Sequence, residues 1–261
     1  MRIATWNVNS VRARGERIAA WLQRSDADVV ALQETKCRDD QFPMELFTEL
    51  GYEVAHNGTS QWNGVAIASR VGLEDVSTSF GQPAWDEEAG PEARAVAATC
   101  GGVRVWSLYV PNGREVDDPH YDYKLRWLER LGVAGREWLS AEPRAPIAFC
   151  GDFNVAPQDD DVWDMAAFEG KTHVTKPERD AFTSVLNAGF SDVVRPHTPG
   201  PGVYTFWDYQ GLSFPKRKGM RIDFVLASPE LAGRVTGATV DREERKGKGP
   251  SDHAPVIVDL D

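Results

Sequence analysis

The sequence predicts an α/β fold in which two mixed β-sheets pack face to face and carry helices on their outer surfaces. Short apolar runs alternate with amphipathic helical segments along the chain. Polar clusters follow four of these runs and precede or open two others. If all six clusters meet at one rim, some neighbouring strands must be antiparallel, because a purely parallel sheet would separate the two groups. Such mixed sheets favour an α/β sandwich.

The first part of the chain is expected to contain two helices and several short strands. The strands are expected at residues 2–6, 29–32, 52–55, 65–69, 94–99 and 103–109. The helix of residues 15–24 has its apolar residues on one face, and the helix of residues 42–50 stops at Gly51. Residues 81–93, rich in Gly, Pro and acids, are expected to form a loop.

The second part is expected to contain two helices and four strands. The helix of residues 123–139 contains Gly132 and Gly135, which are expected to weaken it. A polar excursion at residues 156–178 is expected to precede the second helix, residues 178–186. The expected strands are 146–150, the aromatic run 203–207, 221–226 and 254–260. No linker or fixed-period repeat interrupts this order, so residues 1–261 are expected to form a single domain.

Composition indicates a globular protein of a reducing compartment. The chain has 261 residues, of which 41% are hydrophobic, and this is sufficient for a sizeable core. Its cysteines, Cys37, Cys100 and Cys150, are few and widely spaced, which favours reduced, buried thiols over a disulfide framework. No apolar run approaches the length of a membrane span, and no secretory segment is recognisable. We therefore expect a cytoplasmic monomer without membrane contact.

The net charge restricts how the chain can bind nucleic acid. A formal net charge of -11 argues against binding through bulk electrostatics. It is compatible with a metal-dependent nuclease, whose site needs several acids while basic residues line only the approach. Lys216-Arg217-Lys218 and Arg245-Lys246-Gly247-Lys248 are local candidates, although short charge runs are also typical of solvated loops.

The segment Gly151-Asp152-Phe153-Asn154 directly follows the apolar run of residues 146–150. In isolation it is typical of a turn with an Asx cap. If the extended geometry persists, Asp152 and Asn154 leave the same face of the strand, where one can hold a cation or accept a proton and the other can orient an oxygen. The ends of buried strands are also where ligands bind in open α/β sheets.

The six clusters together offer a set of side chains that is rich in oxygen and contains one histidine. Oxygen ligands suit Mg²⁺ or Mn²⁺, whereas zinc usually takes more His or Cys. Each residue alone has an ordinary structural explanation, but their common position at strand boundaries favours one site. The set is Asn7, Asn9, Glu34, Tyr109, Asn112, Asp152, Asn154, Asp223, Asp252 and His253.

In chain order, these clusters resemble the signature of the exonuclease III type of apurinic/apyrimidinic (AP) endonuclease. The acid, Asn and Ser-Asp-His elements alone are common to the wider endonuclease/exonuclease/phosphatase superfamily. Gln33-Glu34-Thr35-Lys36 and the aromatic residues 204–209 favour the DNA-repair branch. The matching segments are Trp6-Asn7-Val8-Asn9, Leu32-Gln33-Glu34-Thr35-Lys36, Tyr109-Val110-Pro111-Asn112, Gly151-Asp152-Phe153-Asn154, Arg221-Ile222-Asp223 and Ser251-Asp252-His253.

The resemblance implies a four-layered α/β sandwich and a DNA-repair hydrolase that acts in base excision repair. Its reaction would be Mg²⁺-dependent hydrolysis of the phosphodiester 5′ to abasic sites, with Mn²⁺ as an alternative metal. A 3′-to-5′ exonuclease activity and the cleaning of blocked 3′ ends are expected beside it. The expected partner is duplex DNA with abasic sites or blocked 3′ ends, at the nucleoid if the protein is bacterial.

The resemblance also implies roles for the acids and amides. Glu34 resembles the principal metal ligand, with Asn9 beside it and Asp252 as a further acid. Asp152 would orient or deprotonate the attacking water, and Asn154 would help to hold that water. Asn9 stands where many relatives carry Asp, which lowers the charge of the ligand set.

The remaining residues of the signature are expected to position acids or to contact phosphate. Asn7 would position the neighbouring acids, Tyr109 would donate to a phosphate oxygen, and Asn112 would also reach the phosphate. His253, paired with Asp223, would contact the scissile phosphate. Two assignments of the base stay open: His253 takes the proton, or a protonated His253 stabilises phosphate while Asp152 handles water. The second is preferred, because Asp223 and a bound phosphate both raise the pKa of the histidine.

A further group of residues is expected to bind the substrate. Phe206, Met220 and Ile222 match family positions that line the pocket for an extruded sugar, and Trp207 adjoins them. Met220 stands where some relatives have an aromatic residue. A cramped apolar pocket would exclude an intact base, and a missing base makes extrusion cheaper. The residues expected to face backbone phosphates are Lys36, Arg114 and Arg221.

Two rival functions remain open from the sequence. A superfamily phosphatase or phosphodiesterase acting on a non-DNA phosphate ester would use the same metal site. A non-catalytic DNA-binding protein with a lapsed site is the other alternative, and the intact acids and His253 oppose it.

Overall fold

A computed structural model describes residues 1–88 and 90–261. One sheet has six strands in the order β11-β12-β1-β2-β4-β3. Its strands are β1 (Arg2–Asn7), β2 (Val29–Gln33), β3 (Glu53–Asn57), β4 (Val65–Ser69), β11 (Val235–Val240) and β12 (Val256–Leu260). The second sheet, also six-stranded, has the order β5-β6-β7-β8-β10-β9. Its strands are β5 (Glu74–Ser77), β6 (Ala95–Cys100), β7 (Val103–Tyr109), β8 (Ile147–Asp152), β9 (Ser191–Asp192) and β10 (Asp223–Ala227).

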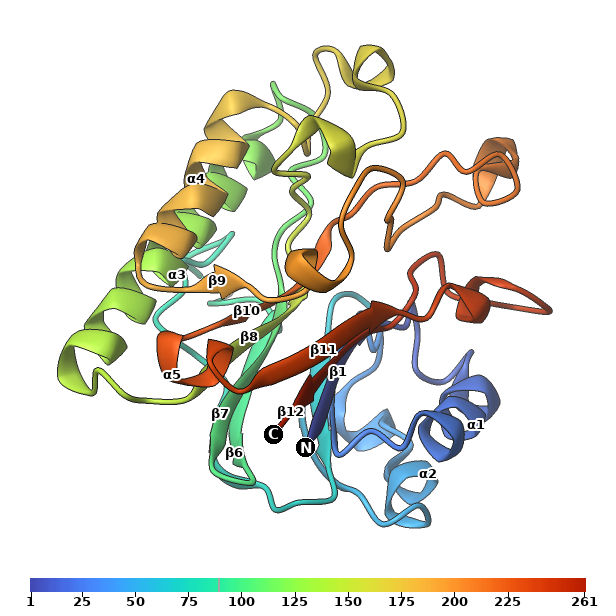
Figure 1. The fold of residues 1–261 in the computed structure, drawn as a ribbon, viewed down its shortest axis with the longest axis vertical. Helices are drawn as coiled ribbons and strands as arrows, with labels where there is room; N and C mark the ends of the chain where they lie inside the picture. Colours follow the sequence, from blue (N-terminus) through green and yellow to red (C-terminus); the bar gives the residue numbers. More distant parts are fainter. Residues whose placement is uncertain (89) are drawn as a thin grey trace.

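Helices cover the outer face of each sheet, as Figure 1 shows with α3 and α4 on one side and α1 and α2 on the other. The α-helices are α1 (Gly15–Ser25), α2 (Met44–Thr48), α3 (Pro119–Ala141), α4 (Lys176–Asn187) and α5 (Pro229–Ala232). Short 3₁₀-helices lie at Asp39–Gln41, Asp159–Asp161, Met165–Phe168, Arg195–His197, Gln210–Leu212 and Arg242–Arg245. This arrangement confirms the predicted four-layered α/β sandwich.

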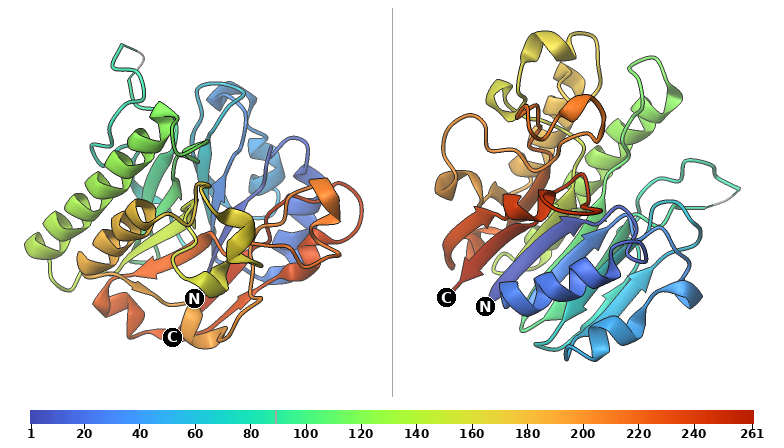
Figure 2. Two further views of the ribbon diagram at one scale, coloured as in Figure 1. Left: turned by 90° about the horizontal axis from the view of Figure 1, so that it is seen from above. Right: turned by 90° about the vertical axis from the view of Figure 1, so that its right-hand side faces the viewer.

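Three large apolar cores among the described residues hold the layers together, and two smaller clusters lie beside them. The central core lies between the sheets and consists mainly of small and β-branched residues such as Val29, Val105 and Val258. Aromatic residues fill the two outer cores, with Trp21 of α1 against Trp6 of β1 on one side. On the other side, Trp127 of α3 belongs to the cluster that covers the second sheet. Because the residues of the central core are small, the two sheets stack closely. Figure 2 shows the layers from two further directions.

The strand directions confirm that polar clusters at both kinds of strand boundary can meet at one rim. β1 runs parallel to β2 and antiparallel to β12. In the second sheet, β8 runs parallel to β7 and antiparallel to β10. The register places Asp152, at the end of β8, opposite Asp223 at the start of β10 and beside Tyr109 of β7. These three side chains thus start from adjacent backbone positions.

The structure differs from the expected elements in several places. The predicted aromatic strand 203–207 is wrong: Phe206 makes only isolated bridges, to Met220 and to His253. These bridges bring a loop over the rim instead of adding a strand to a sheet. The sequence analysis missed β5, β9, β11 and α5, and the predicted helix 42–50 is only the five residues of α2.

The longest helix, α3, is longer than expected and contains both glycines without interruption. Asp118 caps its first turn by accepting a hydrogen bond from the backbone N–H of His120. A Cβ at Gly135 would lie 2.7 Å from the Phe190 ring, so the missing side chain allows close packing of the helix on the sheet. The expected weakening by Gly132 and Gly135 is therefore offset by tertiary contacts.

The three cysteines are buried and unpaired, as predicted. Among the helices of the described residues, none combines the length and the apolar character that a membrane crossing requires. The two termini lie side by side, because Met1 donates its terminal amine to the carbonyl of Leu260.

Candidate active site

Three of the strand ends fold into the same tight turn. The backbone N–H of Asn9 donates to Oδ1 of Asn7, that of Arg114 to Asn112, and that of Asn154 to Asp152, each over 3.0 Å. The final residue of each turn has a positive φ, between 45° and 55°. The extended geometry considered for residues 152–154 therefore does not persist beyond the strand. The Asx turn, considered as the alternative, forms, and it still points both side chains of this segment into one pocket.

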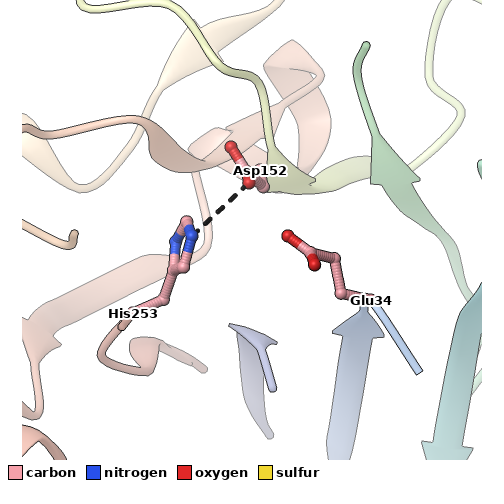
Figure 3. A group of neighbouring side chains, drawn as sticks. All are labelled: Glu34, Asp152 and His253. Atoms are coloured by element: carbon pink, nitrogen blue, oxygen red, sulfur yellow. Dashed lines mark ion pairs between the residues drawn. The ribbon is translucent and has the colours of Figure 1, made fainter. Parts of the chain in front are cut away.

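Asn7 connects the two sheets at the rim. Its Nδ2 donates to Oε1 of Glu34 at 2.8 Å and to Oδ2 of Asp152 at 3.0 Å. Glu34 follows β2 in one sheet, whereas Asp152 ends β8 in the other. Figure 3 shows Glu34, Asp152 and His253 converging from three separate segments of the chain. One buried amide thus fixes the distance between two acids that face each other across the sandwich.

His253 lies between two buried carboxylates. Its Nδ1 donates to Oδ2 of Asp223 at 2.9 Å, and its Nε2 lies 3.7 Å from Oδ2 of Asp152. Burial by itself lowers the pKa of His253, but the charges of Asp223 and Asp152 outweigh this effect and raise the pKa to about 10. The imidazole is therefore protonated at neutral pH and offers positive charge to an anion.

Asp152 is a carboxylate with an unusually high proton affinity. Burial raises its pKa to about 7; the charge of His253 opposes this shift, whereas the charges of Asp223 and Glu34 add to it. Oδ2 of Asp152 lies 3.7 Å from Nε2 of His253, so the charge of each group affects the protonation of the other. A carboxylate in this state can accept a proton from water near neutral pH.

Tyr109 keeps its proton at any ordinary pH. Burial, followed by the nearby charge of Glu34, raises the pKa of this phenol well above its usual value. The hydroxyl is therefore a hydrogen-bond donor in the pocket that also contains Asp152 and His253. A neutral donor at this place suits a phosphoryl oxygen.

The predicted metal ligands lie close together, and two of them contact the ammonium group of Lys36. Nζ of Lys36 is 2.6 Å from Oε2 of Glu34 and 2.6 Å from Oδ1 of Asn9. Asn9 in turn donates through Nδ2 to Oδ1 of Asp252 at 3.1 Å. Glu34 also lies within reach of Asp152 and His253, since one ligand atom from each of the three lies within 4.8 Å of the others. These oxygen donors fit a hard divalent cation, and the position already holds positive charge.

A pocket of about 360 Å³ opens beside these groups. Phe206, Met220 and Ile222 line its apolar side, as predicted, and the Phe206 ring lies 4.9 Å from the His253 ring. The polar side consists of residues from both sheets and from the loops at the rim. These residues are Glu34, Tyr109, Asn112, Asp152, Asn154, His173, Asp208, Asp252 and His253.

The predictions for Trp207 and Arg221 require correction. Trp207 is 1% exposed and packs against Tyr204 and Phe214, so the ring belongs to the core beneath the pocket. Arg221 is also buried, with Nη2 2.8 Å from Oδ2 of Asp192, and cannot reach a DNA phosphate. Alternation along the chain explains both errors, because the neighbours Phe206 and Met220 take the positions at the pocket.

The other two basic residues differ from each other. Lys36 is turned inward toward Glu34 and Asn9, so its ammonium belongs to the site instead of the DNA approach. Arg114 is exposed and lies 3.6 Å from Asp118, which leaves it accessible to a phosphate.

His173 is a site residue that the sequence analysis missed. Its Nε2 lies 3.2 Å from Oδ1 of Asn154 and 3.3 Å from Nδ2 of Asn112. Burial, together with the charge of Lys124, lowers the pKa of His173 to about 3, so the ring is neutral. It lies in residues 156–178, where no periodicity or motif distinguished it from a surface excursion. Asp208, within the aromatic run of residues 204–209, also lines the pocket and was not expected as a site residue.

Comparison with known proteins identifies the family of this fold and site. Residues 4–253 match the model of the endonuclease/exonuclease/phosphatase family. The chain is 31% identical to an exodeoxyribonuclease of Bacillus subtilis, with 98% of each protein covered. This chain belongs to the exonuclease III-type AP endonuclease family. It is therefore a hydrolytic nuclease.

Two solved structures of the family share the whole architecture. An AP endonuclease from Archaeoglobus fulgidus is 36% identical, with a TM-score of 0.93 and coverage of 100% of this chain and 99% of that one. The 3′ phosphatase NExo from Neisseria, solved with a product DNA hairpin, is 37% identical, with the same TM-score and the same coverage. Relatives with different named activities thus resemble this chain equally well.

Proposed function

We propose that this nuclease hydrolyses DNA phosphodiesters 5′ to abasic sites in duplex DNA and also removes nucleotides or blocking groups from 3′ ends, with Mg²⁺ as its metal. The observation that carries this proposal is the buried arrangement of Asp152, Asn7 and His253 at the rim. It provides a proton acceptor and a fixed positive charge within one pocket. The presence of AP endonucleases and a 3′ phosphatase among the relatives supports both substrate classes.

In the proposed reaction, Asp152 accepts a proton from the attacking water or directs its lone pair. Oδ1 of Asp152 is occupied by the N–H of Asn154, and Oδ2 accepts from Asn7, so the carboxylate is held in one orientation. Asn154 is held as well, because its Nδ2 donates to the carbonyl of Val110 at 3.0 Å and its Oδ1 faces the pocket. Such orientation favours a near-attack geometry for water.

Charge that develops on the phosphate would meet fixed donors. Protonated His253 and the neutral hydroxyl of Tyr109 both line the pocket. Asn112 turns its Nδ2 inward, since its Oδ1 accepts from the N–H of Arg114. A divalent cation at Glu34, with Asn9 and Asp252 nearby, would neutralise charge on the phosphoryl and leaving oxygens. Donors that are already oriented cost little reorganisation in the transition state.

The apolar wall of the pocket suits a deoxyribose without a base. Phe206, Met220 and Ile222 are adjacent to His253, so a sugar in contact with them would place its phosphate beside the imidazole. A volume of about 360 Å³ is at the lower end of the range of ligand sites and suits a small occupant such as a deoxyribose with its phosphate. The acidic surface makes bulk attraction of DNA weak, and exposed Arg114 is one local contact for the backbone.

One experiment separates this proposal from phosphatase action on another ester. Three parallel reactions contain the protein, Mg²⁺ and one substrate each. The substrates are a duplex containing one abasic analogue, a nicked duplex with a 3′ phosphate, and an inositol phosphate. We expect product from one or both DNA substrates and none from the inositol phosphate. The opposite pattern would contradict the proposal, and the ratio of the two DNA rates would establish the dominant activity.

A further inference from the structure

Lys124 lies on the buried face of α3, directly beneath the rim that carries the active-site amides. Its side chain is 0% exposed. Nζ donates to the backbone carbonyl of Asn154 at 2.6 Å and to that of Asn112 at 3.1 Å, and it lies 2.5 Å from Oε1 of Glu178. One ammonium therefore joins the turn after β7 to the turn after β8.

Glu178 extends this connection to a third segment. It lies in the first turn of α4, where it forms a capping box with Thr175. Its Oε1 also accepts from the backbone N–H of His173 at 2.8 Å, and its Oε2 from that of Thr175 at 3.1 Å. The Lys124–Glu178 ion pair is thus bonded to the backbone of every segment that brings Asn112, Asn154 or His173 to the pocket.

The three side chains above this ion pair form a compact triangle. Nδ2 of Asn112 lies 3.2 Å from Oδ1 of Asn154, and Nε2 of His173 lies 3.2–3.3 Å from both atoms. Neutral Nε2 of His173 either accepts from Asn112 or donates to Asn154, so two of these three contacts are hydrogen bonds at any one time. A change of about 1 Å in one backbone segment would break the triangle, since all three distances are already at the long end of the hydrogen-bond range.

Burial of an ion pair needs a reason other than stability. Removing two charges from water costs several kcal/mol per ion, and replacement of buried pairs by apolar residues is often neutral or stabilising. Here the ammonium directs its three protons to two carbonyls and one carboxylate, which an apolar side chain cannot do. The benefit is a fixed spacing between two turns that are distant in sequence.

We propose that Lys124, paired with Glu178, is a positioning residue for catalysis, which acts through the backbone of Asn112 and Asn154. Lys124 itself contacts neither water nor phosphate. It fixes the positions of the Asn112 and Asn154 side chains. This inference rests on the proposed DNA hydrolysis, in which Asn154 holds the attacking water and Asn112 the phosphate. Glu178 supports the same geometry by holding the segment of His173.

The first test is the double substitution Lys124→Met/Glu178→Gln, which removes both charges and leaves no buried ion unpaired. A misplacement of about 1 Å can cost about 10²-fold in rate, and we expect a loss in kcat of this order, with KM changed less than about threefold. Arg17→Met is the control, because the ion pair of Arg17 with Glu244 is also mostly buried and neither residue lines the pocket. It is expected to lower the melting temperature without changing kcat. A wild-type kcat in the double variant would overturn the proposal.

The second test asks whether the effect passes through Asn154. Lys124→Met/Glu178→Gln is combined with Asn154→Ala, and kcat is measured for all members of the cycle. Coupled residues give non-additive effects, so we expect a clearly smaller further loss once Asn154 is truncated than in the wild-type background, with the remainder passing through Asn112. If the ion pair acts only on general stability, the full loss will recur in the Asn154→Ala background, which would overturn the proposal.

A third measurement does not depend on activity. Side-chain amide resonances of Asn112 and Asn154 in ¹H–¹⁵N spectra are expected to shift in the double variant and to stay unchanged in Arg17→Met. Unchanged resonances in the double variant would refute the positioning role. Failure of the wild-type protein to cleave DNA would instead contradict the proposed function, and the spectra would still decide the role of Lys124.

Discussion

Nδ1 of His253 lies 2.9 Å from Oδ2 of Asp223, and both side chains are buried at the rim where the sheets meet. The histidine precedes β12 of one sheet, whereas the aspartate begins β10 of the other. This pair keeps the imidazole protonated and turns its Nε2 toward Asp152. The positive charge in the pocket therefore depends on a contact between the two sheets.

Asp223→Asn is expected to lower kcat by about 10²-fold, within the range of a general acid–base contribution. The amide keeps the shape but no longer stabilises the imidazolium or selects its orientation. Steady-state rates on a 3′-phosphate duplex measure the loss. Asp259→Asn, at the exposed ion pair with Arg2, is the control and should retain full activity. A wild-type rate in Asp223→Asn would show that the charge of His253 is not needed.

Lys36→Met is expected to tighten the binding of Mn²⁺. The ammonium lies among the same oxygens that a divalent ion requires. A like charge about 4 Å away costs about 4 kcal/mol at an effective dielectric of about 20, so an increase in affinity of at least about tenfold is expected. Isothermal titration calorimetry measures it. In EDTA the variant should melt at a lower temperature than the wild type, because the Glu34 carboxylate loses its positive partner. Weaker Mn²⁺ binding by Lys36→Met than by wild type would instead show that Lys36 supports metal binding.

Phe206→Ala and Trp207→Ala are expected to separate function from stability. Phe206 lines the pocket, so its truncation should raise KM or lower kcat with a small change in melting temperature. Trp207 is buried in the core, where such a truncation typically costs about 3–5 kcal/mol. Thermal melts and kinetics are compared for both variants. A larger loss of stability in Phe206→Ala than in Trp207→Ala would contradict the assigned positions.

The Lys124–Glu178 pair is expected to contribute to the acid sensitivity of the fold. The charge of Lys124 and hydrogen bonds from Lys124 and two threonines overcome burial and lower the pKa of Glu178 to about 2. A lowered carboxyl pKa gives stability that is complete above the unfolded value of about 4.5 and is lost as the pH falls toward about 2. Between these limits, wild type should lose more stability than Lys124→Met/Glu178→Gln. Urea unfolding at pH 5, 4 and 3 measures the difference, and parallel curves would contradict it.

Much of the fold could be predicted because the strands carry local signals. The runs 65–69 and 103–109 match β4 and β7, and the antiparallel neighbours followed from polar clusters on both kinds of strand boundary. Short or exposed elements such as β5 and β11 lack a clear apolar pattern, so the sequence did not reveal them. Residues 203–207 have the composition of a strand. The backbone of Phe206, however, forms only isolated bridges to Met220 and His253 at the rim, so the segment does not join a sheet.

Site residues at strand boundaries could be predicted from the sequence, whereas those on loops could not. Glu34, Asp152 and His253 lie at strand boundaries and converge as expected. His173 reaches the pocket because Glu178 and the backbone N–H of Ala156 hold its backbone, which is a tertiary effect. The burial of Lys124 is indicated by the sequence, because Lys124 lies at helical spacing from Trp127 and Leu128 on the buried face of α3. A lysine at such a position requires a partner.

Metal-dependent hydrolysis of DNA through Asp152 is tested by a time course with an end-labelled duplex that contains one abasic analogue. Wild type and Asp152→Asn are compared in Mg²⁺ and in EDTA, and DNA binding is followed by fluorescence anisotropy. We expect incision immediately 5′ to the lesion by wild type in Mg²⁺ alone. Asp152→Asn should bind the duplex and release no product. Strong cleavage by Asp152→Asn at saturating Mg²⁺, or equal cleavage by wild type in EDTA, would contradict the account.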